Sequence, residues 1–144
     1  MIIDKTNCNI INTKDVYIHD AIFKGIDYDY SNKKLSVKYL ISFAEKSIKN
    51  IEFYNVKAFK MIVCDCWGKS PHIFDWENID RSEGSLINEI HKVNDKQEDN
   101  FSTLCDKEKD FETVITLSSG NKLTVVCEYI VFDNQGNTWD GSLC

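Results

Sequence analysis

Apolar and polar residues alternate with a period of two along two neighbouring stretches near the start of the chain, residues 21–30 and 33–43. Such alternation predicts half-buried antiparallel strands, and the short polar link Ser31 and Asn32 between them predicts a hairpin. If opposed residues sum to 63, the apolar pairs share one face and an opposite-charge pair lies on the other: Ile22 with Ile41, Ile26 with Val37, Tyr28 with Leu35, and Asp29 with Lys34. This separation of faces fixes the register of a half-buried strand pair.

A second hairpin is predicted near the end of the chain, where residues 111–118 and 122–132 flank Ser119, Gly120 and Asn121. With opposed residues summing to 240, the inward pairs are Leu117 with Leu123, Ile115 with Val125, Thr113 with Cys127, and Phe111 with Tyr129. A three-residue loop of this kind places Gly120 or Asn121 in the left-handed backbone region. Cys127 is then a packing residue of the core.

The strand that begins near Ile51 and Phe53 changes the face of its apolar residues around Asn55. A β-bulge or a corner there would re-aim the side chains without ending the strand. Further along, residues 62–64 leave neither face polar, which predicts a central strand that is covered on both sides. Such a strand requires a fold of two layers.

Two stretches fit no single pattern. Residues 85–95 have apolar positions that suit a helix (Leu86, Ile90 and Val93) but also alternate as an edge strand would, and we favour the strand. Residues 1–15 show no sustained period, so we expect an irregular N-terminal segment with at most a short edge strand at residues 9–12.

These patterns together predict an all-β, mainly antiparallel fold, either a β-sandwich or a flattened barrel of about six to eight strands, with room for one short helix. The length of 144 residues and the hydrophobic fraction of 42% suit one domain, residues 1–144, with one core. No internal repeat or Pro/Gly/Ser-rich linker divides the chain.

Negative charge gathers in the second half of the chain. Residues 75–112 carry 12 acidic and 5 basic side chains, a net charge of −7, whereas the whole chain carries −6. Within this stretch we expect residues 94–110 to form an acidic, flexible connection. Because phosphate groups repel such charge, nucleic acid and anionic membranes are disfavoured and a cationic protein is the expected partner. Glu98 and Asp99 are candidate partner-binding residues.

No apolar run reaches the roughly 18–20 residues of a membrane span, and the N-terminus lacks the order of a signal peptide. We therefore expect a cytoplasmic protein, in which the six cysteines are thiols rather than a disulfide framework.

Residues 62–77 contain the most distinctive sequence of the chain, with Cys64, Cys66, Trp67, Trp76 and the single proline, Pro71. Together with the segment from His19 to Ile22 and the two hairpins, the run Trp-Gly-Lys-Ser-Pro-His resembles small uncharacterised proteins of the YxiG-like type from the Firmicutes. The resemblance implies a small β-rich cytoplasmic protein. It implies no reaction, so no catalytic residue is assigned from it.

Cys64, Cys66 and His72 offer the soft sulfur and imidazole ligands that zinc accepts. Their spacing argues against a metal site, because structural zinc sites begin with wider cysteine pairs and a strand Cys-x-Cys holds its sulfurs too far apart for a tight tetrahedron. Phosphate-binding loops and zinc-protease helix motifs are also missing from the sequence. We expect no metal and no cofactor.

Two imidazole and carboxylate doublets, His19 with Asp20 and His72 with Asp75, could supply general acid and base groups. The same residues also serve as turn-formers, since Asp side chains accept local backbone amides where strands begin. The two tryptophans next to Pro71, Trp67 and Trp76, could likewise line a shallow apolar groove or plug the open end of a sandwich. We list these six residues as ligand or partner-binding candidates.

We expect a non-enzymatic binding or protein-interaction module, one form of which is an immunity-type inhibitor of a cationic partner, with Trp76 as its apolar anchor. The alternative is a small-ligand-binding or hydrolytic domain with a site at the turn between Trp67 and Trp76. Convergence of His19, His72 and Asp75 in one pocket would favour the alternative.

Overall fold

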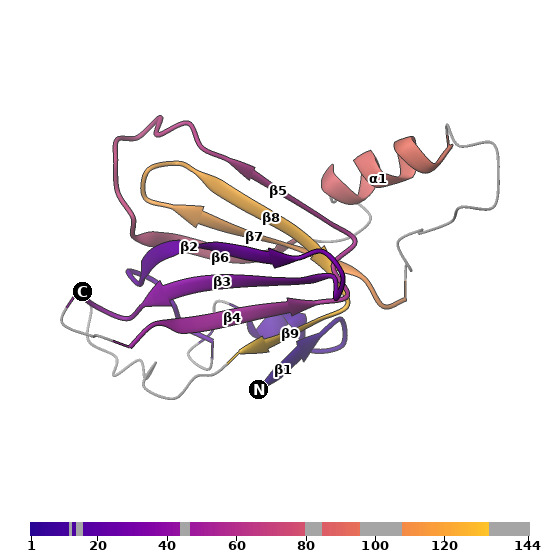
Figure 1. Ribbon diagram of the computed structural model, residues 1–144, viewed down its shortest axis with the longest axis horizontal. Coiled ribbons are helices and arrows are strands. Elements are labelled where there is room, and N and C mark those ends of the chain that lie inside the picture. Colours follow the sequence, from indigo (N-terminus) through magenta and orange to yellow (C-terminus); the bar gives the residue numbers. More distant parts are fainter. Residues whose placement is uncertain (12, 14–15, 44–46, 80–84, 96–107, 133–144) are drawn as a thin grey trace.

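The computed structural model describes residues 1–11, 13, 16–43, 47–79, 85–95 and 108–132, and within them nine strands form two antiparallel sheets (Figure 1). The first sheet has the order β1-β9-β4-β3-β2, and its strands are β1 (Ile2–Asp4), β2 (Ile22–Asp29), β3 (Lys34–Leu40), β4 (Lys49–Tyr54) and β9 (Tyr129–Phe132). The second has the order β5-β8-β7-β6, made of β5 (Ala58–Ile62), β6 (Ile73–Ile79), β7 (Phe111–Leu117) and β8 (Lys122–Cys127). The predicted sandwich is confirmed, with one strand more than expected and no barrel closure among the described strands.

One core fills the space between the sheets. Val37, Phe53 and Phe132 from the first sheet and Trp76 and Val125 from the second are at most 1% exposed. The Trp76 ring meets the edges of Phe53 and Phe132, with centroid distances of 6.5 and 5.9 Å. Cys127 is fully buried in the same core, as its inward position predicted.

The β2–β3 hairpin keeps the predicted register only over its turn-proximal part. Ile26 faces Val37, Tyr28 faces Leu35 and Asp29 faces Lys34, as expected. An irregularity between Phe23 and Gly25 then shifts the pairing, so that Ile22 faces Leu40 and not Ile41. A bulge adds one residue to one strand, and alternation alone does not reveal it.

The β7–β8 hairpin has the predicted inward face but a register two residues away from the predicted one. Phe111 faces Cys127, Thr113 faces Val125 and Ile115 faces Leu123. The loop is residues 118–120, closed by a hydrogen bond from the Leu117 amide to the Asn121 carbonyl oxygen (2.8 Å), and Gly120 has the left-handed φ of 89°. A shift of two leaves every side chain on its face, so the pattern could not distinguish the two registers.

The change of face near Asn55 marks the end of a strand rather than a bulge within one. Asn55 has a φ of 51°, and there the chain leaves β4 in one sheet and enters β5 in the other. β5 is an edge strand, and Val63 just after it is 67% exposed. The predicted central strand at residues 62–64 is therefore wrong, because its apolar residues face solvent.

Residues 85–95 form a helix, α1 (Ser85–Asp95), and the strand prediction is wrong there. Leu86 and Ile87 pack with Val126 on the outer face of the second sheet. The buried Glu112 carboxylate accepts a hydrogen bond from the Ile87 amide at 2.9 Å, which satisfies a donor in the first turn of the helix. No helix in the described residues is long and apolar enough to cross a membrane.

The N-terminal segment is more regular than predicted. β1 pairs with β9, and a 3-10 turn (Cys8–Ile10) follows it, so the edge strand lies at residues 2–4 and not at 9–12. The predicted acidic connection, residues 94–110, lies mostly outside the described residues.

Candidate functional site

Four connections meet at one end of the sandwich: the segment before β2 and the links β3–β4, β5–β6 and β7–β8 (Figure 1, left). We call this the loop end and include in it the adjoining strand termini. Of the nine large apolar side chains that are exposed in the described residues, six lie here: Phe43, Ile48, Ile62, Val63, Trp67 and Phe74. Exposed apolar groups gathered in this way are typical of interaction sites.

His72 is held at the centre of the loop end by backbone hydrogen bonds to both sheets. The Ser118 amide, next to the β7 terminus, donates to the His72 carbonyl oxygen at 2.8 Å. On the other side Ile22, the first residue of β2, forms a β-bridge with His72. The neighbouring amides of Ile73 and Phe23 donate to the carbonyl oxygens of Ala21 and Pro71, each at 2.7 Å. The two sheets are therefore joined here through their main chains.

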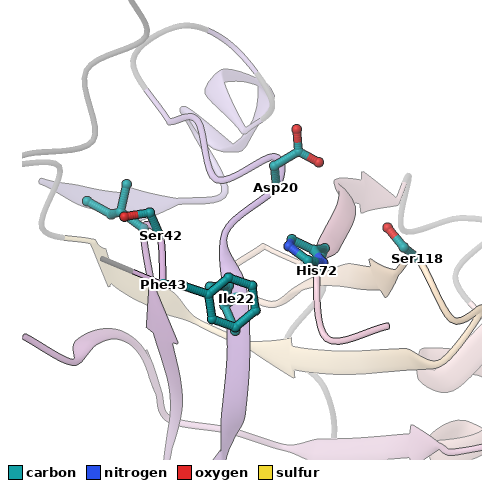
Figure 2. A pocket seen from close by; sticks show the side chains of 7 residues that line it. Asp20, Ile22, Ser42, Phe43, His72 and Ser118 are labelled. Atoms are coloured by element: carbon teal, nitrogen blue, oxygen red, sulfur yellow. The ribbon is translucent and has the colours of Figure 1, made fainter. Parts of the chain in front are cut away.

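A pocket of about 530 Å³ opens beside this junction, and both apolar and polar residues line it. Figure 2 shows the His72 ring flanked by Phe43 and Ser118, with Asp20 at the same opening. Ile22, Ile41 and Ser42 complete the lining. The Phe43 ring meets His72 edge-on at 5.7 Å between centroids, and Ser70 Oγ lies 3.3 Å from His72 Nδ1.

The two predicted doublets behave differently. His19 Nδ1 lies 3.2 Å from Asp20 Oδ2, and Asp20, with a left-handed φ of 66°, is one of the residues that line the pocket together with His72. Asp75 does not line this pocket. The structure thus brings Asp20 and His72 together and leaves Asp75 apart, so the three-residue convergence of His19, His72 and Asp75 does not occur.

Asp75 instead interacts with Glu77, two residues along the edge strand β6. Its hydrogen bond and negative charge raise the pKa of the Glu77 carboxyl above its ordinary value, and partial burial adds to the shift. Lys122 opposes the shift only weakly. The edge of the second sheet therefore carries two carboxyl groups that repel each other when both are ionised.

The two tryptophans have opposite environments. Trp67 is 65% exposed, and its amide donates to the Ser119 carbonyl oxygen at 2.9 Å. Trp76 is 1% exposed, and its Nε1 donates to Thr113 Oγ1 at 2.6 Å inside the sandwich. The prediction that Trp76 is a surface anchor is wrong, because the inward face of β6 buries it.

Cys64, Cys66 and His72 do not form a metal site, since the described residues contain no cluster of three His, Cys, Asp or Glu side chains that could hold an ion. Both cysteines are exposed. Glu98 and Asp99 lie outside the described residues.

Sequence reasoning missed Phe43, Phe74 and Ser118. Phe74 carries a signal that was available, because Ile73 and Trp76 both point inward and a strict alternation between them is impossible. The structure resolves this conflict by an irregularity between Ile73 and Asp75 that leaves Phe74 54% exposed. Phe43 and Ser118 carry no local signal, since only the tertiary fold brings them to the pocket.

No family model matches the sequence, and neither a curated protein nor a solved structure does. The resemblance to the YxiG-like family therefore stays a prediction.

Proposed function

We propose that the protein is a non-enzymatic interaction module that binds a cationic protein through its loop end. The observation that carries this proposal is the gathering of six exposed large apolar side chains on the β3–β4 and β5–β6 connections and on the adjoining residues of β5 and β6. Loops held by a rigid scaffold are a common location for binding surfaces, and buried aromatic residues dominate the energy of many interfaces. Trp67 takes the anchor role that the sequence had suggested for Trp76.

The charge of the partner is inferred from β6. Asp75 and Glu77 lie next to the exposed Phe74, and the raised pKa of Glu77 shows that a positive charge placed nearby would relieve repulsion between the two carboxyl groups. The net charge of −6 would add long-range attraction for a basic protein and disfavour nucleic acid. An immunity-type inhibitor of a basic protein is one form of such a module.

We also propose the cytoplasm as its compartment. Cys64, Cys66 and Cys127 are free thiols, and two of them are exposed, which a reducing compartment would maintain.

The test begins with affinity isolation of a partner from the host, followed by kinetics with the purified pair. Trp67→Ala should raise the dissociation rate by about tenfold or more, as loss of an interface anchor does. Glu77→Lys should mainly lower the association rate, and this loss should shrink as salt screens the charges. A partner without excess positive charge, or one that binds Trp67→Ala as tightly as the wild type, would contradict the proposal.

Matched controls lie away from the loop end. Tyr30 is 75% exposed on the β2–β3 turn at the other end of the sandwich, so Tyr30→Ala removes an equally exposed aromatic ring. Asp27→Lys on β2 changes the net charge by as much as Glu77→Lys does. Both controls should bind as the wild type does, apart from a small general charge effect of Asp27→Lys.

The pocket supports a second candidate function, the binding of a small ligand. Asp20 and His72 line one opening from separate segments, and a lining of apolar residues with a few polar groups is typical of ligand sites. A thermal-shift screen of small polar aromatic compounds tests this candidate, because a ligand that binds the native state raises the melting temperature. A true ligand should lose this effect in His72→Ala and keep it in Tyr30→Ala.

A further inference from the structure

Cys64 and Cys66 lie close together in the β5–β6 connection, and both are exposed. The other two cysteines that the structure describes, Cys8 and Cys127, are buried. Burial raises the pKa of the Cys127 thiol well above its ordinary value, with the negative charge of Asp110 adding to the effect, so this thiol is unreactive. Within the described residues, thiol chemistry with solvent is thus confined to Cys64 and Cys66.

The two cysteines are held in place by a side chain from the β7–β8 connection. Asn121 Oδ1 accepts hydrogen bonds from the backbone amides of Cys64 (2.8 Å) and Asp65 (2.7 Å). The Asn121 amide group in turn donates to Asp65 Oδ1 at 2.8 Å. Three hydrogen bonds from one nearly buried asparagine fix the chain between the two thiols, and none of the three is needed to continue either sheet.

Asp65 shortens the distance between its neighbours. A fully extended chain would place the Cα atoms of residues 64 and 66 about 6.6 Å apart, close to the upper limit of about 6.8 Å for a disulfide. Asp65 instead has a left-handed φ of 45°, and the Gly68 amide closes a tight turn onto the Asp65 carbonyl oxygen at 2.9 Å. The left-handed backbone at Asp65 bends the chain between the cysteines, and the tight turn that follows reverses it over Cys66 and Trp67.

The Cys66 sulfur occupies a fitted position. A β-carbon built on Gly120 would lie 2.5 Å from Cys66 Sγ, so the absence of a side chain at Gly120 makes room for this sulfur. Cys66 Sγ also approaches the Ser119 carbonyl oxygen at 3.9 Å. A hydrogen bond between the two thiols raises the pKa of Cys66 above its ordinary value, with desolvation as a second cause, so Cys66 keeps its proton to higher pH.

We propose that Cys64 and Cys66 form a redox-active dithiol that exchanges with small-molecule disulfides. The Cys64 thiolate attacks one sulfur of the disulfide RSSR, forms a mixed disulfide with it and releases RS⁻, which takes up a proton. Cys66 then gives up its proton and attacks the Cys64 sulfur, which forms the Cys64–Cys66 disulfide and releases the second RS⁻. In balance, the two thiols lose two protons and two electrons, and RSSR gains them as two RSH.

The roles of the two cysteines follow from their surroundings. Cys66 Sγ is packed against Gly120 and the Ser119 carbonyl group, and the pKa of its thiol is raised above the ordinary value. Cys64 is therefore the attacking thiol and Cys66 the resolving one. Disulfides that do form in a reducing compartment are usually transient and either catalytic or redox-sensing, so such an exchange is compatible with the cytoplasmic location proposed above.

The experiment uses the full chain with Cys105→Ser and Cys144→Ser, which removes the two cysteines outside the described residues. The reduced protein is equilibrated in buffers of oxidised and reduced glutathione, quenched with acid, alkylated and analysed by mass spectrometry. We expect a product that lacks two protons, carries no glutathione and yields a peptide cross-linked between Cys64 and Cys66. The ratio of oxidised to reduced glutathione at which half of the protein carries this disulfide should not depend on protein concentration.

Single variants test the order of the two steps. Cys66→Ser should stop at a mixed disulfide between glutathione and Cys64. Cys64→Ser should form its mixed disulfide about tenfold more slowly, because the remaining sulfur is packed against Gly120 and the Ser119 carbonyl group. Both variants change exposed side chains, so circular dichroism should show an unaltered fold.

The asparagine clamp gives an independent test. Asn121→Ala should lower the equilibrium constant for the internal disulfide about tenfold, which corresponds to about 30 mV in the two-electron potential. Should Asn121→Ala fail to fold, Asp65→Gly loosens the same turn without removing Asn121. Asn32→Ala removes a turn hydrogen bond to Asp29 at the other end of the sandwich and should leave the equilibrium unchanged.

Three results would overturn the proposal. The first is stable glutathione adducts on both cysteines without an internal disulfide. The second is an internal disulfide that involves Cys8 or Cys127. The third is an equilibrium constant that is the same in the wild type and in a folded Asn121→Ala or Asp65→Gly variant.

Discussion

The two ends of the sandwich, where the chain turns from one strand to the next, differ in the interactions of their side chains. At the end opposite the loop end, formed by residues 30–33, 55–57, 108–110 and 128, charged groups meet opposite charges. Lys57 Nζ lies 3.6 Å from both the buried Asp110 and Glu128, and Asn55 donates to Glu128 at 2.9 Å. A pocket of about 500 Å³ there is lined by side chains of both signs.

The loop end shows the opposite arrangement. Its main-chain groups are well bonded, as the hydrogen bonds around His72 and Asn121 show, but its large apolar side chains face solvent. At the other end the described residues include two large exposed apolar side chains, Tyr30, whose ring centroid lies 3.8 Å from Lys33 Nζ, and Ile2, which lines the pocket of mixed charge. Ion pairing therefore stabilises one end, whereas the other exposes the apolar side chains through which we propose that the protein binds its partner.

The largest effect is expected where the two tryptophans are compared. Trp76→Ala should lower the free energy of unfolding by about 3–5 kcal/mol, because it empties a large volume in the core. Trp67→Ala should change it by about 0.5 kcal/mol or less, because the side chain is exposed. Urea denaturation of both variants measures the two changes in the free energy of unfolding. Equal losses would contradict the assignment of Trp76 to the core and of Trp67 to the exposed loop end.

A smaller effect is expected at the charged end. Lys57→Ala should cost about 2–3 kcal/mol, since it removes a cationic partner of a buried carboxylate. The matched variant is Lys60→Ala, which breaks the exposed ion pair with Glu89 and should cost about 1 kcal/mol or less. Thermal unfolding at neutral pH measures the stability of both variants. A larger loss of stability in Lys60→Ala than in Lys57→Ala would contradict the role given to Lys57.

The sequence predicted which side chains of each strand point inward better than it predicted which residues pair across neighbouring strands. A period of two determines which side chains of β2, β3, β7 and β8 point inward, and burial selects for it strongly. The bulge near Gly25 and the two-residue shift of β7 against β8 leave that pattern intact, so no count of alternation could have revealed them. The helix at Leu86 was missed because a short amphipathic run fits both periods until Glu112 and Val126 provide its cap and its contact surface.

For the candidate site, the sequence identified individual residues but not which of them lie at the same pocket. Asp20 and His72 were candidates in separate doublets, and only the bridge between β2 and residues 71–73 places them at one pocket. Trp76 was misassigned because its position relative to Trp67 said nothing about which of the two lies on an inward strand face.

The smallest effect concerns pH. The pKa of Glu77 is raised in the folded protein, so the stability it contributes is fully present below its ordinary value near 4.5 and is lost as the pH rises through the folded value. Glu77→Gln should therefore be slightly more stable than the wild type at pH 7, and the difference should vanish below about pH 4. Because Glu77 is exposed, the gain should stay below about 1 kcal/mol. A variant that is less stable at pH 7 would show that the Asp75 and Glu77 pair is not repulsive.

The most direct test of the central claim is site-specific photo-crosslinking in the host cell. Benzoylphenylalanine is placed at Phe74 in the loop end and, in a separate variant, at Tyr30 on the opposite end, so that both positions keep an exposed aromatic side chain. The account predicts a discrete cross-linked product with a basic protein from position 74 and none from position 30. Equal cross-linking from both positions, or a product from position 30 alone, would contradict it.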